Sequence, residues 1–456
     1  MMSKRHMLAP VLLLLCVVLG GASIGGYLGN FILQLVAVVV IILSLAGRQH
    51  APIERPARRL LILLALAAAL LLLQLVPLPP ALWTMLPGRE PLAQGFELLG
   101  LPLPWMPVSL VPWDGWAALA WMLPSIAMVL AVIRLGAFNA SLVSWAFAVT
   151  AVLSVLLGAL QVSGGLNSPW YIYQVTNRGL AVGFFANTNH LATFLLMTIP
   201  FLAALAARRL RNAKRKKEAA GTLVITAALV LVMLVGLLLS TSFAGVGLAV
   251  PVLLASLLIV VRPRGIGRRL TLLGLCGAVL AGAGALLWSP LGNTLGTASF
   301  VSSTAIRQQA LAGTSSAIAD YFPAGSGIGS FAQVYRTYED PWELPRTYMN
   351  HAHSDYVELA LEGGLPAILL ALAFFLWWFG RVISIWREEK PDFIQQAATV
   401  ASGAVLVHSV VDYPLRTAAI AGAFALCCAL MSQARARTRR RSDKAEQADA
   451  RHLSAD

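Results

Sequence analysis

The densest group of residues that could do chemistry is the stretch HAHSDYVELALEGG, which begins at His351 and ends at Gly364. Asp355 and Glu358 form a capping-box-like pair that predicts the start of a short helix, so His351 and His353 stand just before a helix amino terminus. Such an end disfavours an imidazolium and keeps a nearby histidine neutral and able to accept a proton. The stretch is a candidate general-base site, although a structural or solvated histidine pair fits the same pattern.

Two arginines are candidates for holding an anion, because a guanidinium has a fixed charge and forked donors that suit phosphate oxygens. Arg307 follows Ser302–Thr304, which predict a helix cap, and a cation in a first helical turn suggests a nearby anion or acidic partner. A solvated position is the alternative for Arg307. Pro323 and the following GSGIGS end this helix; no strand precedes that run and no Lys-Ser/Thr follows it, so we do not expect a nucleotide loop. Arg178, the second arginine, comes before an apolar segment whose first residues are polar.

Further polar groups lie at the ends of apolar segments. Asn187 and Asn189 open the segment after the second arginine, where polar groups often line a water-filled cavity; helix capping is the alternative. The turn HSVVDYPLR carries His408, Asp412 and Arg416, and its simplest interpretation is a turn held by an Asp412–Arg416 pair.

The elements that position these residues must lie in a membrane. The chain has 456 residues, 58% of them hydrophobic and only 12% charged, with a mean hydropathy of +0.75. Soluble domains have about 25% charged residues, so a soluble enzyme is excluded. The four cysteines lie in apolar runs without a CxxC pair, and they indicate neither a disulfide framework nor a zinc site.

Twelve apolar stretches are long enough to cross about 30 Å of hydrocarbon as helices. They are residues 7–24, 27–46, 60–76, 113–133, 141–161, 184–207, 221–241, 243–261, 270–288, 364–380, 394–411 and 417–433. We expect the first to be retained as a span rather than removed as a signal peptide, because another apolar segment follows directly.

The distribution of charge predicts the orientation of these spans. With the amino terminus in the cytoplasm, 28 of the 34 Lys and Arg residues fall on the cytoplasmic side and six on the other, as the positive-inside rule requires. Both termini are then cytoplasmic. The basic runs RRLRNAKRKK and RARTRRR are expected to contact the anionic lipids of the inner leaflet, and nucleic-acid binding is not expected.

The chain therefore divides into four parts. Residues 1–288 form spans one to nine, with short periplasmic loops at 77–112 and 162–183. Residues 289–363 form a large, partly helical periplasmic loop that carries the candidate site. Residues 364–433 form spans ten to twelve, and residues 434–456 are a basic cytoplasmic tail.

The order of these motifs resembles the bacterial O-antigen ligase and O-antigen polymerase family. Arg178 precedes GFFANTN, Arg307 precedes PAGSGIGSF, and HSDYVELALEGG follows; PVSLVPWDGW at 107–116 and the closing HSVVDYPLR also resemble that family. Each motif alone is weak, but their order in a twelve-span chain is fairly specific. The resemblance covers residues from about 100 to 430 and implies an all-α, GT-C-like membrane protein of the bacterial inner membrane, with its active site facing the periplasm.

The resemblance implies a glycosyltransferase that takes saccharide from an undecaprenyl-diphosphate-linked donor without a metal or another cofactor. His353 matches the catalytic histidine, and Arg307 and Arg178 match the arginines that hold the diphosphate. Ser354 stands where the family usually has asparagine. No Asp-x-Asp occurs in the chain, which favours charge neutralisation by arginine. Asn187, Asn189 and Arg416 complete the expected substrate site.

Several alternatives stay open at this point. Ligase and polymerase differ in the acceptor, which is either the lipid A core or another saccharide, and the sequence does not identify it. A role for His351 is open. A twelve-span transporter or lipid-linked saccharide flippase is the main competing class, although few charges lie within the spans and no internal repeat is visible. A non-catalytic scaffold with polysaccharide assembly partners is the third.

The predicted orientation can be tested without reference to the family. Reporter fusions at Lys214 and Arg264 should give a cytoplasmic signal, and fusions at Arg89 and Thr337 a periplasmic one, because they lie on opposite sides of the arginine asymmetry. A cytoplasmic signal at Thr337 would contradict the orientation and every mechanism built on it.

Overall fold

The structure is a computed structural model that describes residues 4–23, 25–46, 52–261, 274, 277, 298–339, 349–389 and 392–433. Within residues 298–308 it describes the helical backbone but not the side chains. Apart from one isolated β-bridge between Leu78 and Met106, the regular structure of these residues is entirely helical. The expected all-α class is therefore confirmed for the described residues.

The helices follow one another along the chain. The longer ones are α1 (Leu8–Leu19), α2 (Leu28–Ala46), α3 (Arg55–Gln74), α6 (Pro112–Leu135), α7 (Ala140–Ser163), α8 (Thr188–Asn212), α9 (Lys216–Ser240), α10 (Phe243–Val261), α13 (Ala298–Tyr321), α15 (Asp355–Arg387), α16 (Phe393–His408) and α17 (Ala418–Ser432). The short ones are α4 (Pro80–Trp83), α5 (Glu90–Leu98), α14 (Phe331–Tyr335) and the 3-10 helices η1 (Lys4–Met7), η2 (Gly165–Asn167), η3 (Arg336–Tyr338) and η4 (Pro414–Arg416).

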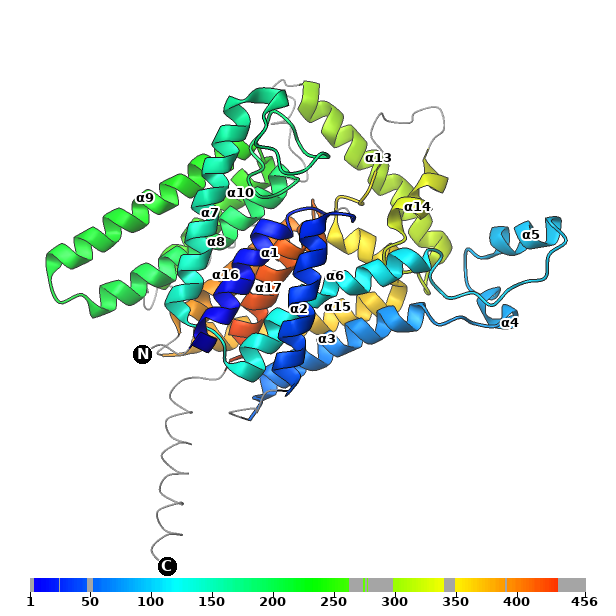
Figure 1. Ribbon diagram of the computed structural model, residues 1–456, viewed down its shortest axis with the longest axis horizontal. Helices are drawn as coiled ribbons and strands as arrows, with labels where there is room; N and C mark the ends of the chain where they lie inside the picture. The colour runs from blue at the N-terminus through cyan, green and yellow to red at the C-terminus, as the bar shows by residue number, and fades with distance from the viewer. Residues whose placement is uncertain are drawn as a thin grey trace, which may run out of the picture.

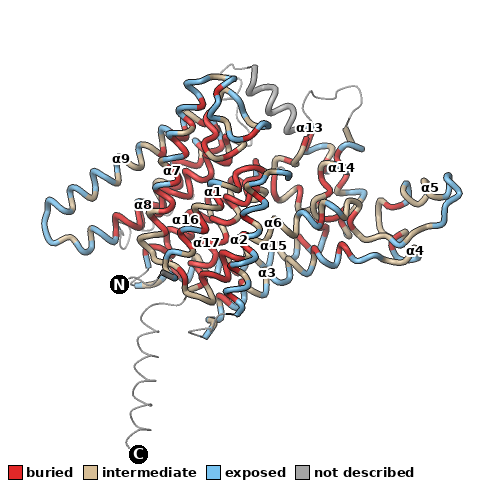
Figure 2. Tube along the Cα trace, viewed as in Figure 1, coloured by how far each residue is buried: buried red, intermediate tan, exposed pale blue. Residues whose placement is uncertain are grey.

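Helix α8 is the centre of the bundle. It packs against α7, α9, α10 and α16, and every residue from 190 to 207 is buried. A helix that is apolar on all sides is stable only when it is covered on all sides. Figure 2 shows this buried centre and, beside it, the largely exposed α9. The outer helices thus present the apolar faces that a bilayer would cover.

Eight helices of the described residues are long and apolar enough to cross a membrane: α2, α3, α6, α7, α8, α9, α10 and α15. The apolar helices α1 and α17 are shorter, and so is α16. These eleven helices coincide with eleven of the predicted spans, while the predicted ninth span, 270–288, lies outside the described residues apart from Gly274 and Gly277. The chain is an all-α membrane protein, and its twelve spans and their orientation stay predictions.

Small residues bring α1 and α17 into close contact. A Cβ atom at Gly20 would lie 2.8 Å from the Cβ of Ala418, and one at Gly422 would lie 2.8 Å from Sγ of Cys16. Between apolar helices, packing of this kind takes the place of a hydrophobic driving force. Because α17 begins just after the turn that carries Asp412 and Arg416, this packing fixes the position of that turn.

A second, smaller core lies outside the bundle, between α13, α14 and the first turns of α15 (Figure 1). It consists of Ala310, Ala317, Phe331, Val334, Tyr335, Met349, Ala352 and Leu361. The loop that carries the two candidate histidines contributes Ala352 to this core, so the loop is packed rather than solvated.

The glycines of GSGIGS are required by close packing. Gly325 and Gly327 have φ angles of +81° and +104°, which L side chains rarely adopt. A Cβ atom at Gly325 would lie 2.6 Å from the carbonyl oxygen of Glu362, and one at Gly327 would lie 2.4 Å from Cα of Ser109. The run is thus a tight junction between the start of α15 and the segment before α6, in agreement with our rejection of a nucleotide loop.

Arg89 ties the segment 77–112 to the same junction. Its side chain is 1% exposed, and its Nη2 donates hydrogen bonds to the carbonyl oxygens of Val108 and Gly325. Its guanidinium lies 5.3 Å from the centre of the Tyr321 ring. Burial lowers the pKa of Arg89 to about 10, although Tyr321 opposes the shift, so the group stays charged at neutral pH.

Three predicted helix boundaries differ in outcome. The expected cap at Ser302–Thr304 is wrong, because α13 already begins at Ala298 and Arg307 lies in its third turn. Its predicted end before Pro323 is confirmed. In α15, Gly364 has non-helical angles (φ 56°, ψ −152°), so the short helix and the span after it are separated by a kink at the predicted place.

The packing at Gly327 predicts a large effect of a single methyl group. Gly327→Ala should lower the stability of the protein by about 1 to 3 kcal/mol, because it forces a strained backbone and a contact with Ser109. Thermal unfolding in detergent measures this loss. Gly95→Ala in α5 is the matched control, since a Cβ atom there meets nothing within 4 Å; equal stability of the two variants would contradict the packing argument.

Candidate active site

Four segments meet at one end of α8. They are the loop before α15 with its two histidines, the first turns of α15, the turn between α16 and α17, and the start of α8 itself. Backbone hydrogen bonds join the first three: the Asp355 N–H donates to the carbonyl oxygens of Ser409 (3.1 Å) and Asp412 (3.2 Å), and the Ser354 hydroxyl also donates to the Ser409 carbonyl (3.3 Å). The sequence-distant motifs are therefore parts of one site.

Asp412 lies at the centre of this site. Its side chain is fully buried, with Oδ1 3.7 Å from Nδ1 of His353 and Oδ2 3.7 Å from Nε2 of His190. Neither oxygen accepts a hydrogen bond from a described residue. Burial acts to raise the pKa of Asp412, but the interactions with His353, His190 and His408 lower it below its ordinary value. Asp412 is thus an ionised, buried carboxylate facing two imidazoles, which is an arrangement that calls for a functional explanation.

His353 is held in an unusual conformation beside this carboxylate. Its φ angle of 52° is left-handed, which costs a non-glycine residue about 1 to 2 kcal/mol. Its side chain is 23% exposed, whereas Asp412 has no exposed surface. Nδ1 faces the carboxylate, and Nε2 forms no hydrogen bond with a described residue. Asp412 can therefore orient the imidazole through Nδ1, while Nε2 is available to accept a proton.

The ring of Tyr413 contacts three imidazoles. Its centre lies 4.4 Å from that of His351, 5.2 Å from that of His190 and 5.2 Å from that of His353. Asn187 reaches the same residue, since its Nδ2 donates to the tyrosine hydroxyl at 3.4 Å. Tyr413 thus joins the start of α8 to the histidine loop.

Three carboxylates on one face of α15 surround Arg416. Nε of Arg416 lies 3.7 Å from Oδ1 of Asp355, and Nη1 lies 3.4 Å from Oε1 of Glu358 and 2.9 Å from Oε2 of Glu362. The acids are buried, while the arginine keeps 21% of its side chain exposed. Burial lowers the pKa of Arg416, but the three carboxylates outweigh it and raise the pKa above its ordinary value, so the cation is permanent.

Each of these carboxylates also holds a second segment in place. Glu362 accepts from the backbone N–H groups of Gly329 and Phe331, in the glycine-rich junction. Glu358 accepts from the N–H of Ala352 (2.9 Å), and its Oε1 lies 2.9 Å from Nδ1 of His351. Glu362 therefore fixes the glycine-rich junction, and Glu358 fixes the loop of the two histidines, relative to the turn that carries Arg416.

Asp355 likewise holds the turn between α16 and α17 in place. Its Oδ2 accepts from the Ser409 hydroxyl (2.7 Å) and from the N–H of Leu415 (3.3 Å). The predicted capping-box-like pair is therefore wrong in its detail: Asp355 and Glu358 do open α15, but their side chains bind other segments, and no side chain caps this helix. The predicted Asp412–Arg416 pair is also wrong, because Asp412 faces histidines and Arg416 faces the acids of α15.

The two asparagines lie where they were expected, at the start of α8. Asn187 caps this helix by accepting from the N–H of Asn189, so the capping interpretation is confirmed for it. The side chain of Asn189 accepts from the Ser242 hydroxyl at 2.7 Å. Both therefore have structural partners, and substrate binding by either stays a prediction.

Of the two predicted diphosphate arginines, Arg178 is not part of the carboxylate cluster. Arg178 is exposed; it donates to the carbonyl oxygen of Leu166 (3.3 Å) and stacks on the ring of Tyr171 at 5.4 Å. The neighbouring Asn177 accepts from the Thr188 N–H, which holds this loop at the start of α8. Arg307 lies on α13, which packs against α15, and its side chain lies outside the described residues.

Sequence reasoning missed the residues that organise the site. Asp412 was assigned to a turn, Glu358 to a cap, and Glu362, His190 and Tyr413 to no role in the site. One signal was available for the acids, because positions 355, 358 and 362 share one face of a helix. No local signal pairs Asp412 with His353, since their contact depends on the packing of α16 and α17.

The fold and site together define a class: an all-helical membrane protein with a buried acid-histidine-arginine cluster at one end of its central helix. The family model described as O-antigen ligase matches residues 227–372, which include α10, α13, α14 and the first turns of α15. The predicted resemblance to the O-antigen ligase family is therefore confirmed, and that family implies a glycosyl-transferring enzyme with a lipid-linked saccharide and an acceptor as substrates. No curated protein matches the chain.

The carboxylate cluster predicts how the protein responds to loss of its cation. Arg416→Gln leaves Asp355, Glu358 and Glu362 buried together without a counter-charge, which should lower stability by about 3 to 5 kcal/mol. The deficit relative to the parent protein should shrink as the pH falls toward about 4, because protonation removes the repulsion in the variant. Thermal unfolding in detergent at several pH values measures both effects.

Arg178→Gln is the matched control, since this arginine is exposed and forms no ion pair with a described residue. Its unfolding temperature should stay close to that of the parent protein. If the deficit of Arg416→Gln were independent of pH, the three carboxylates would not be its cause.

Proposed function

We propose that the chain is a membrane glycosyltransferase that transfers or polymerises oligosaccharide from an undecaprenyl-diphosphate-linked donor on the periplasmic face of the bacterial inner membrane, without a metal ion. The observation that carries this proposal is the pairing of His353 with the buried Asp412, 3.7 Å apart. A partly exposed imidazole backed by an ionised carboxylate is an arrangement that can take a proton from a hydroxyl group.

The proposed reaction uses the two ring nitrogens of His353. The acceptor hydroxyl gives its proton to Nε2 of His353 while its oxygen bonds to the anomeric carbon of the donor sugar. The bond between that carbon and the phosphate oxygen breaks, and the electron pair leaves with the undecaprenyl diphosphate. Asp412 stabilises the imidazolium that forms, and its 3.7 Å separation from Nδ1 can shorten to a hydrogen bond when the substrates are bound.

The diphosphate needs positive charge because it leaves with several negative charges. We assign this role to Arg307 and Arg178, whose guanidinium groups can each make two-pronged contacts with phosphate oxygens. Asn187 and Asn189 would contact the saccharide at the start of α8. Arg416 keeps 21% of its side chain exposed, so it can contact substrate with the part that the carboxylates leave uncovered.

The acceptor is a saccharide or the lipid A core, and the residues of the site are compatible with both. The described residues contain no group of three or more His, Cys, Asp and Glu side chains arranged to hold a metal ion. Two acids of the large loop, Asp340 and Glu343, lie outside the described residues. Metal independence is therefore tested directly in the experiment below, by adding a chelator.

His353→Ala should lower turnover by about 100 to 10,000-fold while donor binding stays nearly intact, because only the proton acceptor is lost. Purified protein, lipid-diphosphate saccharide and acceptor measure this in the presence of a chelator. Asp412→Asn should lower kcat in the same direction with little change in KM, since it removes only the charge behind the ring. His6→Ala is the matched control, because His6 contacts the carbonyl oxygen of Phe138, at the opposite end of the bundle.

Four results would count against the proposal. Parent-like transfer by His353→Ala contradicts the role of His353 as the base, and absence of transfer by the parent protein favours a transporter or a scaffold. Activity that disappears with chelator and returns with magnesium contradicts the metal-free reaction. An equal effect of Asp412→Asn on donor binding and turnover contradicts its assigned role behind His353.

A further inference from the structure

Two adjoining cavities lie at the end of α8 that is remote from His353. The first has a volume of about 430 Å³ and lies between α7, α8 and α9; the second, of about 310 Å³, lies between α7, α8 and α16. They share Ser141, Leu205 and Arg208 as lining residues. Volumes in this range are typical of sites for small ligands. Neither cavity has a part in the proposed reaction.

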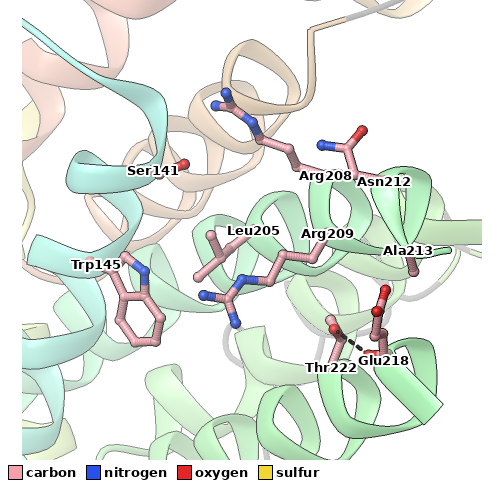
Figure 3. A pocket seen from close by; sticks show the side chains of 9 residues that line it. All are labelled: Ser141, Trp145, Leu205, Arg208, Arg209, Asn212, Ala213, Glu218 and Thr222. Carbon is pink, nitrogen blue, oxygen red and sulfur yellow. Dashed lines mark hydrogen bonds between the residues drawn. The ribbon is translucent and has the colours of Figure 1, made fainter. Parts of the chain in front are cut away.

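Three arginines of the last turns of α8 line these cavities. Arg208 lines both, Arg209 the first and Arg211 the second. Figure 3 shows Arg208 and Arg209 leaving the helix in different directions, with Arg209 pointing toward Trp145. Its guanidinium lies 5.5 Å from the centre of that ring, and the guanidinium of Arg211 lies 5.1 Å from that of Phe393. Stacking on aromatic rings orders the two groups on the cavity walls.

The described residues leave the pocket with a net positive charge. None of its three arginines forms an ion pair with a described residue. Two acids also line the cavities, Glu218 the first and Asp392 the second, and both bind backbone: Glu218 accepts from the N–H of Lys214 (3.0 Å), and Asp392 caps α16 by accepting from the N–H of Ile394 (3.1 Å). Three arginines against two acids leave the lining with an excess of positive charge. The arginine charge therefore favours an external anion.

The backbone adds to the same field. Helices α7, α9 and α16 all begin beside the cavities, at Ala140, Lys216 and Phe393, and a helix amino terminus carries a partial positive charge. The exposed run 214–217 supplies four more cations just outside the pocket. An anion with hydrogen-bond acceptors, such as a phosphate group, matches this environment.

The walls indicate what is attached to the phosphate. Trp145, Leu205, Phe393 and Ile394 line the cavities beside the arginines, at the ends of apolar helices where an aromatic ring meets the membrane surface. We propose that this pocket binds the phosphodiester headgroup of an acidic phospholipid, with Arg208 as its central ligand. The site is independent of the proposed transferase reaction, and it differs from a diffuse basic surface because defined side chains form it.

Native mass spectrometry of the full-length protein in detergent tests this assignment, with titration by short-chain phosphatidylglycerol, short-chain phosphatidylcholine or inorganic phosphate. The pocket variant is Arg208→Gln with Arg211→Gln. The matched control is Arg215→Gln with Lys217→Gln, which removes the same charge from exposed residues that do not line the cavities. All four side chains are exposed, so both variants should fold.

We expect phosphatidylglycerol to bind the parent protein more tightly than phosphatidylcholine, and the pocket variant to raise its Kd about tenfold or more through the loss of two charged hydrogen-bonding groups. The control should raise it less than about threefold, because its residues contribute only screened, long-range attraction. Equal losses in the two variants would show a diffuse surface and overturn the proposal. Inorganic phosphate binding as tightly as phosphatidylglycerol would overturn the lipid assignment, leaving a site for a soluble anion.

Discussion

The contact of one arginine with three buried carboxylates is the interaction on which the rest of the site depends. Burying an unpaired carboxylate is costly, so Asp355, Glu358 and Glu362 are stable inside the protein only with Arg416 among them. Their remaining oxygens accept hydrogen bonds from three other segments. The charge cluster thus holds α15 against the α16–α17 turn. It also fixes the positions of the histidine loop and the glycine-rich junction.

Much of the fold could be predicted from the sequence because a membrane imposes long apolar helices. Eleven described helices coincide with predicted spans, and the kink at Gly364 follows from two glycines and a nearby proline. The start of α13 was misplaced because Ser302–Thr304 have the residue types of a cap yet lie within the helix. Local residue types predict where helices can begin, whereas packing decides where they do.

The candidate site was only partly predictable. His353 stood out through its neighbours in sequence, but its partner Asp412 is 59 positions away. Asp412 belongs to a turn in which Arg416 is the nearer candidate partner. The obvious pairing of Asp412 with Arg416 is wrong because the short helix η4 turns Arg416 toward α15. Charge complementarity across distant segments is set by tertiary structure, and no periodicity in the sequence records it.

The left-handed backbone of His353 has a consequence for how this protein balances durability against activity. Most residues pay a conformational cost at this φ, while glycine and asparagine pay little. A chain selected for stability alone would therefore place one of those two residues here. Retaining histidine means that the protein is less stable than its own fold permits, and that variants chosen only for resistance to heat are expected to lose the imidazole first.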